Sequence, residues 1–115
     1  MMAPNITHHA DLAHRLEVVA ISGPVTTSDH ADSVARLGEL APNELALVVN
    51  LTGLTAVTET GWAGMRRLAQ RCAEAGRQLI FVCADMMMRA ELVLADLDTL
   101  APVVDADERA VALAA

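Results

Sequence analysis

The feature that most limits what this chain can fold into is an almost unbroken apolar run over residues 45–51. A strand with one face in solvent alternates apolar and polar side chains, whereas a strand covered on both faces is apolar nearly throughout. We therefore expect this run to be the central strand of a sheet that has other elements packed on both of its faces.

Strand-like and helix-like segments alternate along the rest of the chain. Apolar residues recur at helical spacing in some segments and are grouped in short runs in others. Such alternation with crossover helices predicts an α/β domain with a mainly parallel or mixed sheet flanked by helices. We expect strands over residues 16–22, 45–51, 78–84 and 103–104, and helices over residues 29–40, 60–76, 86–94 and from residue 107 onward.

Turn-forming residues indicate where several of these strands end. Gly23 and Pro24 are expected to end the first strand, and residues 41–43 to form a turn before the central strand. Residues 52–61, rich in Thr and Gly, are expected to connect the central strand to the next helix. Residues 1–15 carry only weak signals.

Helix ends are marked in the same way. Ser28 or Asp29 is the expected N-cap of the first helix, because a short polar side chain accepts hydrogen bonds from unpaired backbone N–H groups. Gly76 is expected just past the end of the second helix, where a left-handed backbone conformation favours glycine.

Composition excludes several classes of function. The chain has 115 residues, of which 54% are hydrophobic, and this suits one domain with a single core. Its formal net charge of −7 opposes binding to a phosphate backbone, so we expect no nucleic-acid partner. No segment resembles a leader peptide or a membrane span. We expect a cytoplasmic protein without direct membrane insertion, in which Cys72 and Cys83 are buried thiols.

Residues 50–64 read NLTGLTAVTETGWAG, a strand end that leads into a helix start. They resemble the signature of STAS domains, in which Asp or Asn, Leu, a small residue and Gly lead to Asp-Ser-Ser-Gly-Leu-Gly. Residues 21–23, 76–81 and 91–100 resemble, in the same order, the family's Leu-Ser-Gly strand, its Gly-Gly-Arg strand entry and a later helix. The resemblance is to the anti-sigma factor antagonist (anti-anti-sigma factor) type.

The resemblance implies a fold for the whole chain. We expect a single STAS-like α/β domain over residues 1–115, with a core over about 16–115 and a weakly specified segment over 1–15. The sheet is expected to be mixed and four- to five-stranded. About four helices are expected, mainly on one face of the sheet.

The resemblance also implies a function in bacterial signal transduction and transcription regulation. Unphosphorylated antagonists of the family capture a kinase-like, ATP-binding anti-sigma factor, and phosphorylation of the first Ser of the signature reverses this. The face that would bind the partner comprises Val25, Thr26, Thr27, Asp29, Trp62, Met65 and Arg66. The resemblance therefore implies a protein–protein interaction module.

The signature departs from the family at its phosphorylation position. Family Asp-Ser-Ser-Gly is replaced by Thr58, Glu59, Thr60 and Gly61, so a carboxylate stands where the modified Ser is expected. Glu59 would supply a permanent negative charge at a helix start, which makes the protein either a phosphomimetic or a phosphorylation-independent antagonist. Alternatively, Glu59 is an ordinary first-turn acid, with Thr58 as the N-cap. Modification of Thr58 or Thr60 is a further possibility.

Other residues have both a functional and a structural interpretation. Trp62 is either an exposed binding anchor or a core residue, and we expect core packing. A metal site built from His8, His9, His14 and His30 lacks companion ligands at a recognised spacing, so we expect no metal. Arg66, Arg67 and Arg71 could face an acidic partner but are expected to form a solvated face. Met86, Met87 and Met88 could offer an adaptable apolar surface, but two of the three are expected to pack in the core or at its edge.

An enzyme is not expected, because the chain has no phosphate-binding Gly-rich loop and no recognisable nucleophile with its base. No cofactor is expected either. The alternative function is an accessory STAS subunit of a signalling scaffold or of an ATP-binding cassette lipid transporter. The sequence leaves open whether the chain forms a homodimer.

Overall fold

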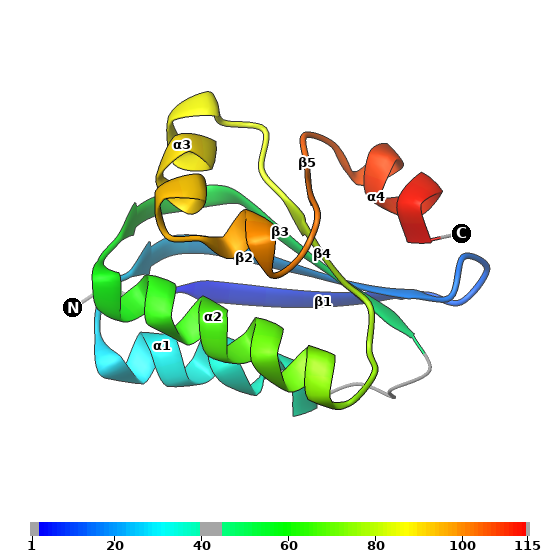
Figure 1. The fold of residues 1–115 in the computed structure, drawn as a ribbon, viewed down its shortest axis with the longest axis horizontal. Helices are drawn as coiled ribbons and strands as arrows, with labels where there is room; N and C mark the ends of the chain where they lie inside the picture. Colours follow the sequence, from blue (N-terminus) through cyan, green and yellow to red (C-terminus); the bar gives the residue numbers. More distant parts are fainter. Residues whose placement is uncertain (1–2, 40–44, 115) are drawn as a thin grey trace.

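The computed structural model describes residues 3–39 and 45–114, and the turn expected at residues 41–43 lies outside these ranges. The described residues form one five-stranded sheet with four helices packed on it (Figure 1). The strands are β1 (Asn5–Asp11), β2 (Leu16–Val25), β3 (Ala46–Val57), β4 (Leu79–Val82) and β5 (Val103–Val104). The helices are α1 (Ser28–Ala35), α2 (Glu59–Glu74), α3 (Met86–Leu94) and α4 (Asp107–Ala114), with 3-10 turns η1 (Arg36–Glu39) and η2 (Leu97–Thr99).

The sheet is mixed, as expected. Its strands lie in the order β1-β2-β3-β4-β5, with β1 antiparallel to β2 and every other neighbouring pair parallel. Parallel neighbours need a crossover connection, and helices supply it between β2 and β3, β3 and β4, and β4 and β5. The expected α/β fold with a mixed sheet is therefore confirmed.

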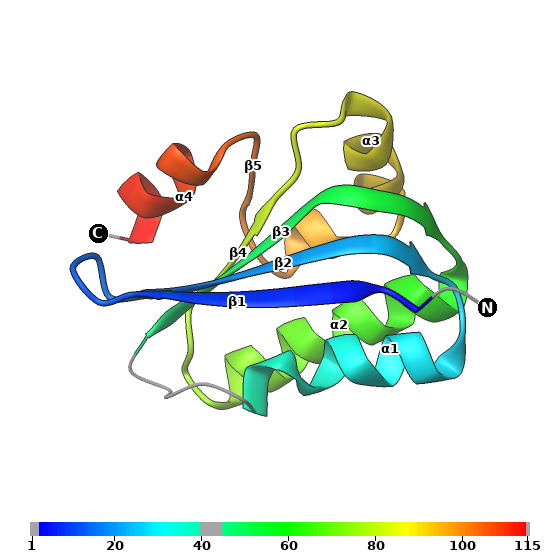
Figure 2. The same ribbon diagram turned by 180° about the vertical axis from the view of Figure 1, so that it is seen from behind.

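The helices cover the two faces of the sheet unequally (Figures 1 and 2). The larger apolar cluster joins one face to α1, α2 and α3, whereas the smaller cluster joins the other face to Ala110 of α4. In β3, Leu47, Val49 and Leu51 belong to the first cluster and Val48 to the second. The apolar run is thus the middle strand, covered on both faces, and most of the helices lie on one face as expected.

The expectation that β3 ends near residue 51 is wrong, because the strand continues to Val57. Its pairing with β2 shifts register between Ala20 and Ser22, where β3 contributes one residue more than β2, and shifts again past Gly23. Such bulges bend a strand and interrupt its alternation. The side chain of Asn50 accepts a hydrogen bond from the Thr52 backbone at 2.9 Å within the first bulge. Residues 52–57, whose Thr- and Gly-rich composition suggested a loop, are therefore the bulged second half of β3.

β2 also extends beyond its expected end. Gly23 and Pro24 lie inside the strand, which ends at Val25, and Gly23 adopts a φ of 87° at the second register shift. β1 was not expected, because only Ile6 of its side chains packs against the core. It forms by antiparallel pairing with β2 along its whole length.

The helix ends follow known capping geometry. The N-cap of α1 is Thr27, one residue before the expected Ser28 or Asp29, and its side chain accepts from the His30 backbone. After α2, Gly76 has a φ of 68° as expected, and its N–H donates to Ala73. The following N–H donates to the carbonyl of Cys72, which completes a Schellman motif.

Helices α1 and α2 approach closely because α2 presents a glycine to α1. A Cβ on Gly64 would lie 2.6 Å from the carbonyl oxygen of Ala31 and 2.8 Å from its Cα and Cβ atoms. These are contacts that real side chains do not make, so the distance between the two helices depends on the absence of a side chain at this position.

We expect Gly64→Ala to lower the free energy of unfolding by roughly 2–3 kcal/mol, since overpacking against backbone atoms forces the helices apart. Gly76→Ala is the matched control, because a Cβ there meets nothing within 4 Å and only the left-handed backbone is strained. That strain costs about 1 kcal/mol. Urea denaturation measures both values, and an equal or smaller loss for Gly64→Ala would contradict the packing argument.

Both cysteines are buried free thiols, as expected. Burial raises the pKa of Cys72 and that of Cys83. Because the thiolate is the reactive form, we expect neither residue to react with an aromatic disulfide reagent in the native protein at neutral pH, and both to react in denaturant. Fast reaction of the folded protein would show that one thiol is accessible.

Candidate functional site

The starts of α1 and α2 lie side by side at the end of the sheet where β2 and β3 finish (Figure 1). The parallel strands β2 and β3 end at Val25 and Val57, which are register partners. Each strand leads directly into a helix that is capped by a threonine, Thr27 for α1 and Thr58 for α2. The two strand-to-helix junctions that the sequence indicated as a partner-binding face are therefore brought together.

Hydrogen bonds fix the two junctions to each other. The backbone N–H of Thr58 donates to Val25 at 3.3 Å, and its hydroxyl donates to the carbonyl of Thr26 at 3.1 Å. The same hydroxyl oxygen accepts from the Gly61 backbone at 3.4 Å, which confirms the expected N-cap. The N–H of Thr26 in turn donates to Nδ1 of His30 at 3.2 Å. The junctions therefore form one connected network.

Gly61 makes this close approach possible. It is buried in the first turn of α2, and a Cβ at its position would overlap the carbonyl oxygen of Val25 and lie 2.9 Å from a methyl group of Val57. Any larger residue would push the start of α2 away from the end of β2. The glycine of the signature therefore allows the start of α2 to contact the end of β2.

Glu59 is the first residue of α2, and its side chain is 76% exposed. Its carboxylate is paired with the guanidinium of Arg66, whose other terminal nitrogen donates to the carbonyl of Ala95 at 3.1 Å. A negative charge at a helix N-terminus is favourable, because the unpaired N–H groups carry partial positive charge. Arg66 therefore connects the start of α2 to the end of α3.

Three residues expected on the partner-binding face lie in the core instead. Val25 and Met65 are fully buried, and Trp62 is 5% exposed, so their side chains cannot form a flat docking surface. The structural interpretation of Trp62 is confirmed. The residues of this face that reach solvent are Thr26, Thr27, Asp29, Thr58, Glu59, Thr60 and Arg66.

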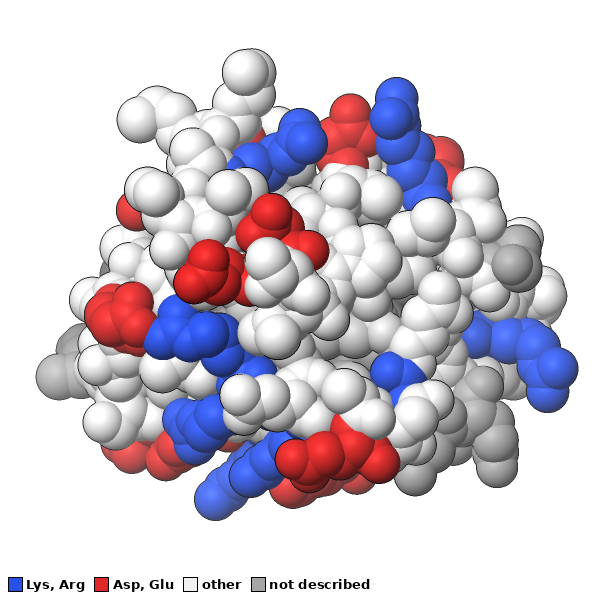
Figure 3. All heavy atoms as spheres, in the orientation of Figure 1, with Lys and Arg blue, Asp and Glu red and all other residues white. Residues whose placement is uncertain are grey.

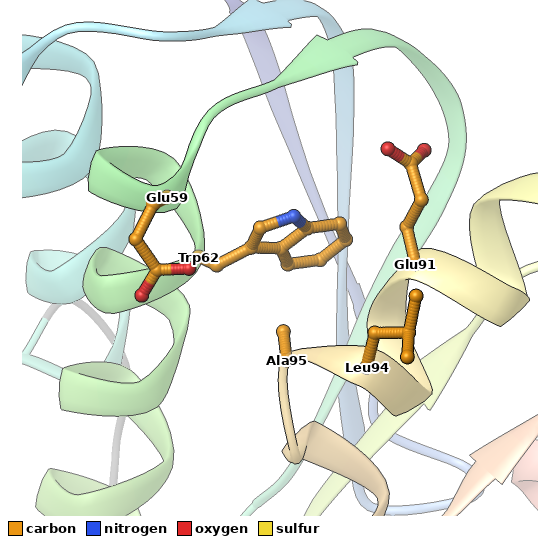
Figure 4. A pocket seen from close by; sticks show the side chains of 5 residues that line it. All are labelled: Glu59, Trp62, Glu91, Leu94 and Ala95. Carbon is orange, nitrogen blue, oxygen red and sulfur yellow. The ribbon is translucent and has the colours of Figure 1, made fainter.

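A pocket between α2 and α3 lies beside Glu59. It has a volume of about 220 Å³ and is lined by Glu59, Trp62, Glu91, Leu94 and Ala95 (Figure 4). The indole ring of Trp62 extends from α2 towards α3, with Glu59 on one side of it and Glu91 on the other. One wall of the pocket is formed by Glu59 and Trp62 of α2, and the other by Glu91, Leu94 and Ala95 at the end of α3. The sequence did not indicate this pocket, because the two walls are at least 29 residues apart in the chain.

The outer face of α3 is apolar and exposed. Met86 and Met87 are each 80% exposed and Leu94 is 84% exposed, whereas Met88 alone of the three methionines is buried. Two of the three methionines were expected to pack, but only Met88 does, because α3 contacts the core along one face only. Exposed methionines provide an adaptable contact surface.

The arginines of α2 are paired within the chain. Arg67 lies 3.0 Å from a carboxylate oxygen of Asp32, and Arg71 lies 2.5 Å from one of Glu39. Figure 3 shows arginines beside acidic side chains along this face, with further acidic side chains between α3 and the start of α2. Such exposed pairs contribute about 0–1 kcal/mol each. These arginines are therefore not a free basic surface for an acidic partner.

The structure separates the histidines considered as metal ligands. His8 is paired with Glu17 at 3.0 Å and His14 with Asp11 at 2.8 Å, while His30 is buried at the junction. The hydrogen bond between the His14 side chain and the Asp11 carboxylate is the main reason why the pKa of Asp11 lies below its usual value. No three metal-ligating side chains gather among residues 3–39 and 45–114. Over the same residues, no helix is long and apolar enough to span a membrane.

Comparison with solved structures shows the same fold in several proteins. An anti-sigma factor antagonist from Mycobacterium paratuberculosis matches with a TM-score of 0.73 and 17% identity, over 96% of this chain and 94% of that chain. The unphosphorylated antagonist SpoIIAA matches with a TM-score of 0.63 and 10% identity, over 93% and 94%. The STAS domain of a SulP transporter from Vibrio cholerae matches with a TM-score of 0.68 and 20% identity, over 83% and 77%.

A comparison with curated proteins finds no match. The family model of the STAS domain matches residues 4–110, which includes every strand and the first half of α4. The mixed sheet, the paired junctions and the signature at the start of α2 agree with this match. The chain therefore belongs to the STAS domain family.

Proposed function

We propose that this protein is a regulatory module that captures a kinase-like anti-sigma factor and does so independently of phosphorylation at the signature position. The observation that carries the proposal is the exposed carboxylate of Glu59 at the start of α2, in the place of the Ser that STAS antagonists modify. Binding would use the two joined junctions and no catalytic step.

The pairing of Glu59 with Arg66 favours phosphorylation-independent binding over a phosphomimetic state. A phosphoserine carries about −1.5 to −2 charges at neutral pH, whereas Glu59 carries one and shares it with a guanidinium. The net field at the start of α2 is therefore closer to that of an unmodified helix start than to that of a phosphorylated one. Unmodified antagonists are the ones that capture their partner.

The hydrogen bonds of Thr58 support the same interpretation. The hydroxyl of Thr58 both donates to Thr26 and accepts from Gly61, so modification there would remove the N-cap and break the link between the junctions. We propose that Thr58 does not substitute for the missing Ser.

The test compares wild type, Glu59→Ser and Glu59→Ala for binding to candidate anti-sigma kinases by calorimetry, with and without ATP. We expect all three to bind without ATP, with affinities within about threefold, since the pair of Glu59 with Arg66 is exposed. With ATP, only the Ser variant is expected to incorporate phosphate and dissociate. Glu59→Ala is the matched control, because it removes the carboxylate without adding a hydroxyl.

Binding of the Ser variant alone would instead support the phosphomimetic version, with wild type held permanently in a released state. If no variant binds any anti-sigma kinase, the antagonist function is rejected. Phosphate on Thr58 of the wild type would reject the proposal that this threonine serves only as the N-cap.

A second proposed function is that of an accessory STAS subunit of a signalling scaffold or a transporter. The observation that favours it is the likeness of the fold to a SulP transporter STAS domain. The exposed apolar face of α3 would then contact another subunit. Affinity purification of the tagged protein at its natural level should recover a transporter or scaffold subunit in stable proportion, and recovery of an anti-sigma factor alone would exclude this function.

A further inference from the structure

His30 is a titratable side chain placed between the two strand-to-helix junctions. It belongs to the first turn of α1 and is 7% exposed, and its Nδ1 atom lies 3.2 Å from the backbone nitrogen of Thr26. Histidine is the side chain whose charge changes between about pH 5 and 8 in ordinary surroundings. A proton taken up at this position would act directly on the geometry of the candidate binding face.

The hydrogen bond from Thr26 requires one protonation state of the ring. The backbone nitrogen of Thr26 can only donate, so Nδ1 of His30 is the acceptor and carries no proton. Such a ring is neutral and has its single proton on Nε2. In the protonated ring both nitrogens are donors, and Nδ1 would then face another N–H group. Protonation of His30 and this hydrogen bond therefore exclude each other.

The peptide group that His30 holds also contacts α2. Its N–H belongs to Thr26 and its carbonyl to Val25, and the two lie in one rigid plane. That carbonyl accepts from the Thr58 backbone at 3.3 Å and lies against Gly61, where a Cβ would overlap it. A rotation of the plane that takes the N–H away from His30 also moves the carbonyl relative to the start of α2. The protonation state of His30 is thereby transmitted from α1 to α2.

The charged groups near His30 come from α1 and from the part of α2 that faces it. The ends of β2 and β3 and the neighbouring start of β1 carry no charged side chain, and η1 follows the far end of α1. Two ion pairs join Asp32 to Arg67 and Glu59 to Arg66. Asp29, which precedes His30, makes no ion pair among the described residues. An experiment at acid pH therefore has to separate His30 from Asp29 and Glu59.

We propose that His30 is a proton-sensitive switch of the binding face: the neutral ring holds the two junctions together, and the protonated ring releases the Thr26 peptide group and weakens partner capture. The sign follows from the hydrogen bond, because only the neutral ring accepts it. The joined face is present at neutral and alkaline pH and is lost as the pH falls through the titration of His30. His30 acts through the backbone of Thr26 and is thus a positioning residue.

Three variants separate proton uptake from the other effects of the side chain. His30→Asn keeps an acceptor, because Oδ1 of asparagine is as many bonds from the backbone as Nδ1 of histidine, and asparagine takes up no proton in this range. His30→Ala removes the acceptor. His14→Asn is the matched control, since His14 pairs with Asp11 in the turn between β1 and β2. The full chain, labelled with nitrogen-15 and carbon-13, is followed by NMR from about pH 8 to about pH 5.

We expect the ring resonances of His30 and the amide resonances of Thr26 and Thr58 to change with one shared midpoint, in wild type and in His14→Asn. Hydrogen-exchange protection of the Thr26 N–H should fall roughly tenfold over this range, as expected for loss of one hydrogen bond to a buried group. His30→Asn should keep this protection at both ends of the range, and His30→Ala should lack it at both. A response that comes from Asp29 or Glu59 would persist in His30→Asn.

Three results would each overturn the proposal. The first is protection of the Thr26 N–H that does not depend on pH in the wild type. The second is a pH response of the Thr26 and Thr58 amides that persists in His30→Asn. The third is a His30 ring that stays neutral down to about pH 5.

As a regulation of partner capture, the inference rests on the proposed function, so the same proteins are also tested for binding to the anti-sigma kinases at both ends of the pH range. We expect the wild-type affinity to fall roughly tenfold at the acid end and that of His30→Asn to stay constant. Equal wild-type affinity at both ends, while the amides titrate, would overturn the regulation.

The NMR measurement needs no partner and therefore separates the two proposals. If the amides titrate as expected and no kinase is captured, the switch at His30 stands and the antagonist function fails. If a kinase is captured and the amides do not respond to pH, the antagonist function stands and the switch fails.

Discussion

The parallel pairing of β2 with β3 is the constraint on which the rest of the structure depends. It places Val25 opposite Val57, so that α1 and α2 start next to each other. Gly61 then allows the start of α2 to contact the carbonyl of Val25, and Gly64 allows the two helices to pack closely. A shift of this register by one residue would exchange the faces of every side chain in the strand and separate the two junctions.

Electrostatic contacts in this protein connect elements within the chain. Each of Arg66, Arg67 and Arg71 on α2 reaches a carboxylate of the same chain, on α2 itself, α1 or η1. These three arginines therefore form ion pairs within the chain and not with a partner. Glu91 on α3, by contrast, makes no ion pair among the described residues. The surface around α3 carries both charges, because Arg89 on the same helix also makes no ion pair among the described residues, and exposed apolar side chains lie between them.

Local features of the site could be predicted where they depend only on residues within one helical turn. The cap at Thr58 and the left-handed Gly76 depend only on neighbours three or four residues away, and both were predicted. The cap at Thr27 was misplaced by one residue, because several adjacent polar side chains can each serve as an N-cap. Exposure was less predictable: Met87 and Trp62 have similarly apolar side chains, yet one faces solvent and the other the core.

The order and type of the elements from β2 onward, the buried middle strand and the signature of the STAS family were determined by the sequence itself, because apolar spacing and turn chemistry act over a few residues. Tertiary structure alone decided the rest. β1 is a strand only because β2 supplies its hydrogen bonds, and β3 continues past its apolar run because bulges keep it paired to β2. The pocket beside Trp62 exists only where α2 and α3 meet, since residues far apart in sequence become neighbours only through the packing of both helices on the sheet.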